Sequence, residues 1–150
     1  MPIPEHASTN PIQILMVEDN PADARLVREV MRDSKMLNEI HWVADGVEAM
    51  AFLRRQGKYA NAPRPNIVFL DLNMPRKDGR EVLHEVKTDA DLRRIPVVIM
   101  TSSQAEEDIA RAYDQHANCY VRKPLDFQQF HRVVQTLENF WFATVELPTR

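Results

Sequence analysis

Five short apolar runs alternate along the chain with five segments in which apolar residues recur at helical spacing. Runs that are apolar at nearly every position are typical of strands buried on both faces of a parallel sheet. We expect the strands at residues 12–17, 39–44, 67–70, 95–100 and 118–121, of which the second has the weaker apolar pattern. The alternation predicts an α/β sandwich, in which helices cover both sides of one parallel sheet.

Capping signals mark where two of the helices begin. Asn20 is followed by proline, and asparagine caps the first amides of a helix while proline fits its first position. Ser103, with Glu106 three residues later, predicts a capping box for the fourth helix. The other helices are expected at residues 47–57, at residues 81–87 and from residue 125 onward.

Length and composition indicate one domain. A chain of 150 residues can bury a core without a disulfide, and its one cysteine, Cys119, rules out an internal disulfide and is compatible with a reducing cytoplasm. We expect a flexible tail at residues 1–10, the domain at residues 11–143 and a C-terminal extension at residues 144–150.

Charge and hydropathy argue against two classes of partner. The 19 basic residues are nearly balanced by 22 acidic residues, and no basic stripe follows the chain as it would in a nucleic-acid binder. The sequence has no apolar run long enough to span a membrane and no signal-peptide pattern. We therefore expect a cytoplasmic protein that binds neither nucleic acid nor membrane.

Polar or charged residues follow four of the five expected strands. Glu18 and Asp19 follow the first strand, Asp71 the third, Thr101 the fourth and Lys123 the fifth. The carboxyl ends of parallel strands share one edge of the sheet, so we expect these residues to converge there. Carboxylates about 4 Å apart repel by about 4 kcal/mol at an effective dielectric of 20, so this cluster needs a cation.

These residue types suit phosphoryl transfer with a divalent cation. Glu18, Asp19 and Asp71 offer the hard oxygen ligands that Mg²⁺ or Mn²⁺ prefers, and the backbone carbonyl of Asn73 could add another. Asp71 could then attack phosphorus and form an aspartyl phosphate. The cation and Lys123 would neutralise the charge on the transferred group.

Each feature also has an ordinary structural interpretation. Glu18-Asp19 could be a solvated acidic turn, Asp71 a helix cap, and the Thr-Ser-Ser segment at residue 101 a cap for the next helix. Asp78 and the glycine after it are interpreted as a structural turn. Only the joint pattern favours a functional site.

Four motifs in order resemble the receiver domain of two-component response regulators. They are an acid pair after the first strand, Asp-x-x-Met-Pro-x-x-Asp-Gly from Asp71, Thr-Ser from Thr101, and Lys-Pro from Lys123. The resemblance covers about residues 12–140. It implies a flavodoxin-like (βα)5 doubly wound sandwich with a five-stranded parallel sheet in the order 2-1-3-4-5.

The same resemblance implies roles for the site residues. Asp71 would be the phosphoacceptor of a phosphorelay, Glu18 and Asp19 the metal-site acids, Thr101 the switch hydroxyl and Lys123 the lysine of the site, with a cis peptide after it. The chain would not be an enzyme beyond its own phosphorylation from a phosphodonor and its autodephosphorylation. Small polar residues at positions 73 and 103 predict appreciable loss of phosphate.

Other parts of the chain resemble, more narrowly, the response regulators of cyanobacterial-type phytochromes. This resemblance is carried by Asn-Pro-Ala-Asp at residues 20–23, the loop at residues 58–65 and the segment at residues 140–148. It implies a sensor histidine kinase with a bilin photoreceptor as the phosphodonor, while the receiver itself carries no chromophore. It does not name a downstream target.

The resemblance further implies a switch that pairs Thr101 with Tyr120. Phosphorylation would draw the hydroxyl toward the phosphoryl group, let the ring turn inward and change the surface of the fourth helix, fifth strand and fifth helix. Two or three hydrogen bonds to a charged group, each worth roughly 1.5–3 kcal/mol, supply the energy that inverts such an equilibrium.

The fifth helix carries more apolar residues than one core-facing stripe requires. We hypothesise that the surplus forms a homodimer interface. The interface residues are predicted to be Phe130, Val133, Phe140, Trp141 and Phe142.

Three other function classes fit less well. A hydrolase of the haloacid-dehalogenase kind would carry Asp-x-Asp after its first strand, whereas Asp71 follows the third and position 73 is asparagine. A flavin-binding domain would want a Ser/Thr/Gly-rich phosphate loop where Glu18-Asp19 lies. No segment is left for a helix-turn-helix that would bind DNA.

Overall fold

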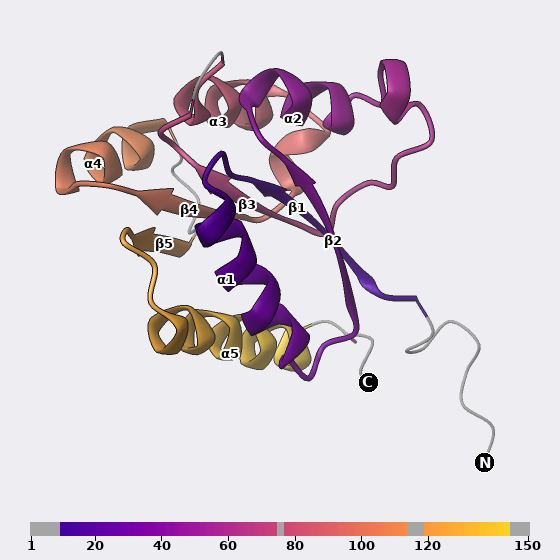
Figure 1. Cartoon of the computed structure of the whole chain (residues 1–150). Coiled ribbons are helices and arrows are strands. Elements are labelled where there is room, and N and C mark those ends of the chain that lie inside the picture. Colours follow the sequence, from indigo (N-terminus) through magenta and orange to yellow (C-terminus); the bar gives the residue numbers. More distant parts are fainter. Residues whose placement is uncertain (1–9, 75–76, 114–118, 145–150) are drawn as a thin grey trace.

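The computed structural model describes residues 10–74, 77–113 and 119–144, and of residues 109–113 and 140–144 it describes the backbone alone (Figure 1). The predicted tail at residues 1–10 and the extension at residues 144–150 fall almost wholly outside this range. The elements in chain order are β1 (Ile12–Val17), α1 (Pro21–Arg32), β2 (Asn38–Val43), α2 (Gly46–Leu53), the 3₁₀ turn η1 (Gly57–Tyr59), β3 (Ile67–Asp71), α3 (Gly79–Thr88), the 3₁₀ turn η2 (Leu92–Arg94), β4 (Val97–Thr101), α4 (Gln104–Tyr113), β5 (Cys119–Arg122) and α5 (Phe127–Thr144).

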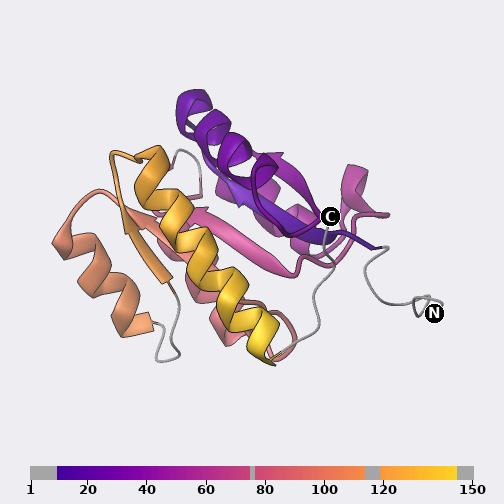
Figure 2. The ribbon, with the colours of Figure 1, turned by 90° about the horizontal axis from the view of Figure 1, so that it is seen from below.

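The five strands form one parallel sheet in the order β2-β1-β3-β4-β5, which confirms the predicted architecture. Helices α1 and α5 lie together on one face, and α2, α3 and α4 lie on the other (Figures 1 and 2). The carboxyl ends of all five strands therefore meet at one edge of the sheet, where the connections to the helices begin.

Side chains alternate along each strand between two apolar clusters. Leu15 and Val17 contribute to the cluster beneath α2 and α3, whereas Ile14 and Met16 contribute to the cluster beneath α1 and α5. In the second cluster the rings of Phe69 and Phe130 meet edge to face, with centroids 5.4 Å apart. The three central strands are thus buried on both faces, as their nearly unbroken apolar runs predict, whereas the edge strands β2 and β5 are partly exposed.

Helices α1 and α4 begin directly after the capping residues that the sequence predicts. The Asn20 side chain accepts hydrogen bonds from the amides of Ala22 at 2.9 Å and Asp23 at 3.3 Å. The Ser103 hydroxyl accepts from the Glu106 amide at 3.2 Å, but the Glu106 carboxylate accepts from the amide of Ser102 rather than that of Ser103. The predicted capping box is therefore present with one of its two bonds shifted by a residue.

Several boundaries differ from the prediction. Helix α2 ends at Leu53 instead of near Gly57, because Arg55 already takes the left-handed conformation, with φ of 54°. Helix α3 begins at Gly79, since Asp78 is its N-cap and accepts from the next two amides. Strand β4 starts at Val97, two residues later than expected, and β2 and β5 are each displaced by one residue.

Two further features bear on the expectations from sequence. The peptide bond between Lys123 and Pro124 is cis, as the resemblance implies. In the described part of the chain, no helix combines the length and apolar character that crossing a membrane requires.

Candidate functional site

The three predicted acids lie together at the carboxyl edge of the sheet. Glu18 and Asp19 follow β1 directly and Asp71 is the last residue of β3, and one carboxylate oxygen from each lies within 4.8 Å of the others. The edge opens into a pocket lined by Asp19, Asn20, Pro21, Asp71, Asn73, Ser102 and Lys123. The structure therefore brings together groups that are about fifty residues apart in the sequence.

Lys123 reaches into this cluster from the end of β5. Its Nζ atom lies 2.8 Å from Glu18 Oε2, 3.0 Å from Asp71 Oδ2 and 3.1 Å from Asp23 Oδ2. Burial acts to lower the pKa of Lys123, but the hydrogen bonds to Glu18 and Asp71 outweigh it and hold that pKa above its ordinary value. The ammonium group therefore stays charged and partly neutralises the acids.

Glu18 is the most buried of the acids, with no exposed surface. Burial raises the pKa of its carboxyl to about 8, against the hydrogen bond from Lys123, which lowers it, and with the charge of Asp71, which raises it further. Its Oε1 atom also accepts from the Asn20 amide at 3.0 Å. The acid is thus fixed in place but costly to ionise without more positive charge nearby.

The Asp71 carboxylate is held at both oxygens. Oδ2 accepts from Lys123, and Oδ1 accepts from the amide of Asn73 at 3.0 Å. The following loop packs closely on this strand end, because a Cβ atom added at Gly79 would lie 2.2 Å from the carbonyl oxygen of Asp71. The glycine that sequence analysis treats as part of a turn is therefore required for this close approach.

Thr101 and Tyr120 lie on the same face of the sheet. Thr101 is the buried last residue of β4, two positions after Ile99, which pairs in register with Tyr120 of β5. The Tyr120 ring is half-buried and packs against the cluster beneath α2 and α3. The amide of Lys123 donates to the carbonyl of Thr101 at 2.7 Å, which ties the two strand ends together.

Two residues of the site were missed by the sequence analysis. Asp23, in the first turn of α1, pairs with Lys123, and the only signal for it is that acids are favoured there by the helix dipole. Trp42, near the end of β2, donates from its indole Nε1 to the backbone carbonyl of Glu18 at 2.6 Å. No sequence pattern distinguishes such a tryptophan from one that only fills space beside a sheet.

The predicted dimer interface needs one correction. Phe130 has no exposed surface and packs against Phe69, so it is part of the core and cannot contact a second copy. Val133 is partly buried against the same cluster. The side chains of Phe140, Trp141 and Phe142 lie outside the described residues.

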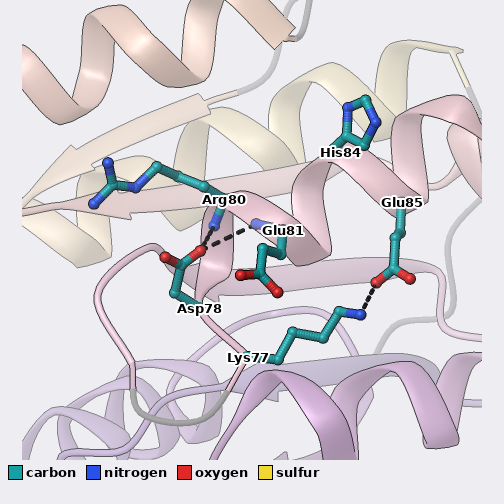
Figure 3. Close-up of a pocket in the computed structure, with 6 residues that line it drawn as sticks. All are labelled: Lys77, Asp78, Arg80, Glu81, His84 and Glu85. Atoms are coloured by element: carbon teal, nitrogen blue, oxygen red, sulfur yellow. Dashed lines mark hydrogen bonds and ion pairs between the residues drawn. The ribbon is translucent and has the colours of Figure 1, made fainter.

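A separate pocket lies beside α3 (Figure 3) and is lined by Lys77, Asp78, Arg80, Glu81, His84 and Glu85. Its charges are largely committed to the fold: Lys77 pairs with Glu85 at 2.5 Å, and Asp78 caps the helix. Acids and bases alternate along its wall, which gives it no preference for one sign of ligand.

The acidic cluster fits a divalent cation. Oxygens bound to one Mg²⁺ at about 2.1 Å lie at most about 4.2 Å apart, so a small adjustment or one bridging water would gather the three carboxylates around an ion. The buried Oε2 atom of Glu18 makes an ion pair with Lys123 but accepts no hydrogen bond among the described residues. Asp19 is exposed, so water can complete the coordination.

Known proteins are similar to this chain in sequence. A sequence model of the response regulator receiver domain matches residues 14–135. Response regulator Rcp1 of Synechocystis sp. is 50% identical over 141 residues, which cover 94% of this chain and 96% of Rcp1. The probable methanogenesis regulatory protein FilR2 of Methanothrix harundinacea is 40% identical, covering 89% of this chain and 86% of FilR2.

Solved structures of related proteins have the same fold as this chain. The phosphorylated cyanobacterial phytochrome response regulator RcpA superposes with a TM-score of 0.78 at 48% identity, covering 93% of this chain and 100% of RcpA. The Mn²⁺-bound form of Rcp1 superposes with a TM-score of 0.77 at 50% identity and the same coverage of both chains. The bacteriophytochrome response regulator RtBRR gives 0.77 at 38% identity, covering 93% of this chain and 84% of RtBRR.

Proposed function

The chain belongs to the response regulator receiver family, and we propose that it receives a phosphoryl group from a histidine kinase on Asp71. The observation that carries this assignment is the Asp71 carboxylate, which lines the open pocket and is held between the Lys123 ammonium and the Asn73 amide. Among the acids of the cluster, only Asp71 combines this fixed geometry with a lysine at its outer oxygen and access to the pocket.

In the proposed reaction, a carboxylate oxygen of Asp71 attacks the phosphorus of a phosphohistidine. The new P–O bond replaces the P–N bond, and the imidazole of the kinase leaves as the neutral ring with a proton taken from water. Glu18, Asp19, Asp71 and the Asn73 carbonyl would hold Mg²⁺ or Mn²⁺, which when bound neutralises charge on the phosphoryl oxygens. Lys123 loses its bond to Asp71 Oδ2 and turns its charge to the phosphoryl group.

A small phosphodonor tests the assignment. The protein is incubated with phosphoramidate and Mg²⁺, and intact mass spectrometry should detect one added phosphoryl group. Asp71→Asn, or chelation of the metal, should abolish the addition, whereas Asp78→Asn should retain it because Asp78 only caps α3. Addition that survives in the Asp71→Asn variant would refute the assignment.

The proposed phosphodonor is the kinase of a phytochrome. Support comes from the similarity to the cyanobacterial phytochrome response regulator RcpA, at 48% identity, and to the bacteriophytochrome response regulator RtBRR, at 38% identity. A phytochrome-type histidine kinase loaded with labelled phosphate should transfer it within seconds to minutes, and an unrelated histidine kinase should transfer it far more slowly. Equal rates from both would remove the phytochrome assignment and leave Asp71 as acceptor.

The proposed output is the surface of α4, β5 and α5, altered through Thr101 and Tyr120. Arg122 of β5 contacts α4, since it donates to Gln104 at 2.9 Å and lies 3.4 Å from Glu107. A movement of β5 would therefore change these contacts with α4. Thr101→Ala should keep phosphorylation but lose any phosphate-linked change in association. If association still changed, the hydroxyl switch would be wrong.

We also propose that this face forms a homodimer through Val133, Phe140, Trp141 and Phe142. The support is the apolar surplus of α5, which one core-facing stripe does not use. Analytical ultracentrifugation at tens of micromolar, with and without phosphodonor, should detect a dimer, and the variant Phe142→Glu should be monomeric. A monomer under both conditions would contradict the proposal. No activity beyond phosphorylation and autodephosphorylation of the chain itself is proposed.

A further inference from the structure

Trp42 has an unusual position for a large apolar residue. It lies near the carboxyl end of β2, an edge strand of the sheet, and 41% of the residue's surface is exposed. A tryptophan that serves only to fill the core would bury more of its surface, because that burial is what stabilises the fold. Its polar atom instead has a defined partner, the backbone carbonyl of Glu18 at 2.6 Å.

This bond completes a clamp on Glu18. The amide of Glu18 donates to the carbonyl of Val43 at 3.1 Å, so both backbone groups of Glu18 are bound by consecutive residues of β2. The strand itself ends at Val17, and the chain turns away toward α1 within a few residues. The indole therefore adds one hydrogen bond between β2 and the chain just after β1, where the regular pairing of the two strands has ended.

The clamp fixes the direction of Asp19. The peptide group that joins Glu18 to Asp19 is planar, so holding its carbonyl oxygen fixes the plane from which the Asp19 Cα departs. The Asp19 side chain is exposed, and among the described residues no hydrogen bond or ion pair holds it. Its orientation thus depends on its backbone, whereas Glu18 and Asp71 are held through their side chains by Lys123.

We propose that Trp42 is a positioning residue of the acidic site, whose indole N–H holds the Glu18–Asp19 peptide so that the Asp19 carboxylate faces a divalent cation. The inference rests on the proposed metal binding at this site. It predicts that ordering of Asp19 by a cation is transmitted to the indole through one hydrogen bond.

Removing the donor should weaken the metal site. Trp42→Phe keeps an aromatic ring but has no N–H, and the loss of one hydrogen bond worth about 0.5–1.5 kcal/mol corresponds to a roughly 2- to 12-fold weaker Mg²⁺ affinity. Arg28→Ala is the matched control, because the Arg28 guanidinium lies over the same ring, 5.8 Å from its centroid, without touching the Glu18 carbonyl. That variant should bind Mg²⁺ as the parent protein does.

Affinity is measured by calorimetry with Mg²⁺ alone, and a spectroscopic readout accompanies it. The chain has two tryptophans, so the indole N–H resonance of Trp42 is identified in a ¹H–¹⁵N spectrum by its absence from Trp42→Phe. In the parent protein this resonance should shift along the same saturation curve as the calorimetric signal. It should not shift in Asp19→Asn.

The outcomes separate the inference from the proposed function. If the parent protein binds Mg²⁺ and is phosphorylated, but Trp42→Phe binds Mg²⁺ equally well or the indole resonance does not respond, then Trp42 has no positioning role. If the parent protein binds no divalent cation, both proposals fail. Should Trp42→Phe fold poorly, the Trp42 resonance is identified instead as the one that remains in Trp141→Phe. Its response to Mg²⁺ in the parent protein and in Asp19→Asn then tests the positioning role.

Discussion

Replacing Lys123 by methionine should destabilise the protein through the carboxylates it leaves behind. The Nζ atom lies 2.8 Å from Glu18 and 3.0 Å from Asp71, whose side chains are 0% and 2% exposed. At an effective dielectric of 20, each such pair attracts by about 5–6 kcal/mol before the cost of desolvating the lysine. Methionine matches the length of the stem but provides no charge.

The net loss can be estimated from the acids alone. Ionised carboxylates whose oxygens lie within 4.8 Å of one another repel by at least about 3.5 kcal/mol per pair at the same dielectric. This agrees with the about 3–5 kcal/mol that is typical when one partner of a buried ion pair is removed. Asp23 adds less, because its side chain is 20% exposed and water screens it. We therefore expect Lys123→Met to lower the free energy of unfolding by about 3–5 kcal/mol at about pH 8.5 without divalent cations.

Two conditions should reduce the stability lost in Lys123→Met. At about pH 5.5 Glu18 can take up a proton, because burial already raises its pKa, and the repulsion then falls. Mg²⁺ at about 100 times its dissociation constant should restore about 2.7 kcal/mol by binding the folded state. The gain should be at least as large in the variant as in the parent, since no ammonium competes for the acids.

Urea unfolding at the two pH values, with and without Mg²⁺, measures all of these effects. Lys58→Met is the control, because the Lys58 side chain is 71% exposed and lies 3.5 Å from Glu48, so its loss should cost little. An equal loss at both pH values with no rescue by Mg²⁺ would mean that Lys123 stabilises the fold by packing, and the electrostatic reasoning would be wrong.

Three further predictions concern the same fold. Without divalent cations, the free energy of unfolding should fall as the pH rises from about 5 to about 8, because burial raises the pKa of Glu18 to about 8 and the folded state keeps a proton that the unfolded state releases. Urea unfolding at a series of pH values should therefore give a steeper fall of stability with pH for the parent than for Glu18→Gln, and equal slopes would contradict this. Gly79→Ala should reduce phosphorylation by phosphoramidate at least about tenfold, since its Cβ would lie 2.2 Å from the Asp71 carbonyl and displace the strand end; labelling at the parent rate, followed by mass spectrometry, would contradict this. Ser34→Ala should cost about 1–3 kcal/mol in urea unfolding, because the buried Glu138 carboxylate loses a hydrogen bond of 2.8 Å, and a loss below about 0.5 kcal/mol would show that water replaces it.

The convergence of the acids could be predicted because it depends on topology and not on detail. Once the strands are parallel, residues that follow them share an edge, so Glu18, Asp19 and Asp71 come together whatever the loops do. The contacts of Asp23 and Trp42 could not be predicted in this way. They depend on the angle at which α1 leaves β1 and on the rotamer of one edge-strand side chain, neither of which leaves a periodic signal.

Local conformation accounts for the boundary errors as well. Gly57 predicts the end of α2, but Arg55 takes the left-handed conformation two residues earlier and ends the helix there. Gly57, with φ of 58°, instead begins the 3₁₀ turn η1. Phe130 follows the apolar spacing of α5 equally well as a core or a surface residue, and only its contact with Phe69 decides between them. Periodicity identifies a face of a helix but not which residues at its border are buried.

In the proposed phosphorylation of Asp71, the charge of the site sets the order of events. Glu18, Asp19 and Asp71, when ionised, place three negative charges within a few ångströms, and Lys123 cancels one. A phosphodonor is itself an anion, so without more positive charge it would be repelled from the acid that must attack it. Lys123 is also bonded to the attacking carboxylate and cannot leave it unless another cation takes over that role. Glu18, Asp19 and Asp71 would hold a divalent cation that supplies the missing positive charge. Lys123 could then turn its ammonium to the incoming phosphoryl group, so we expect cation binding to precede transfer.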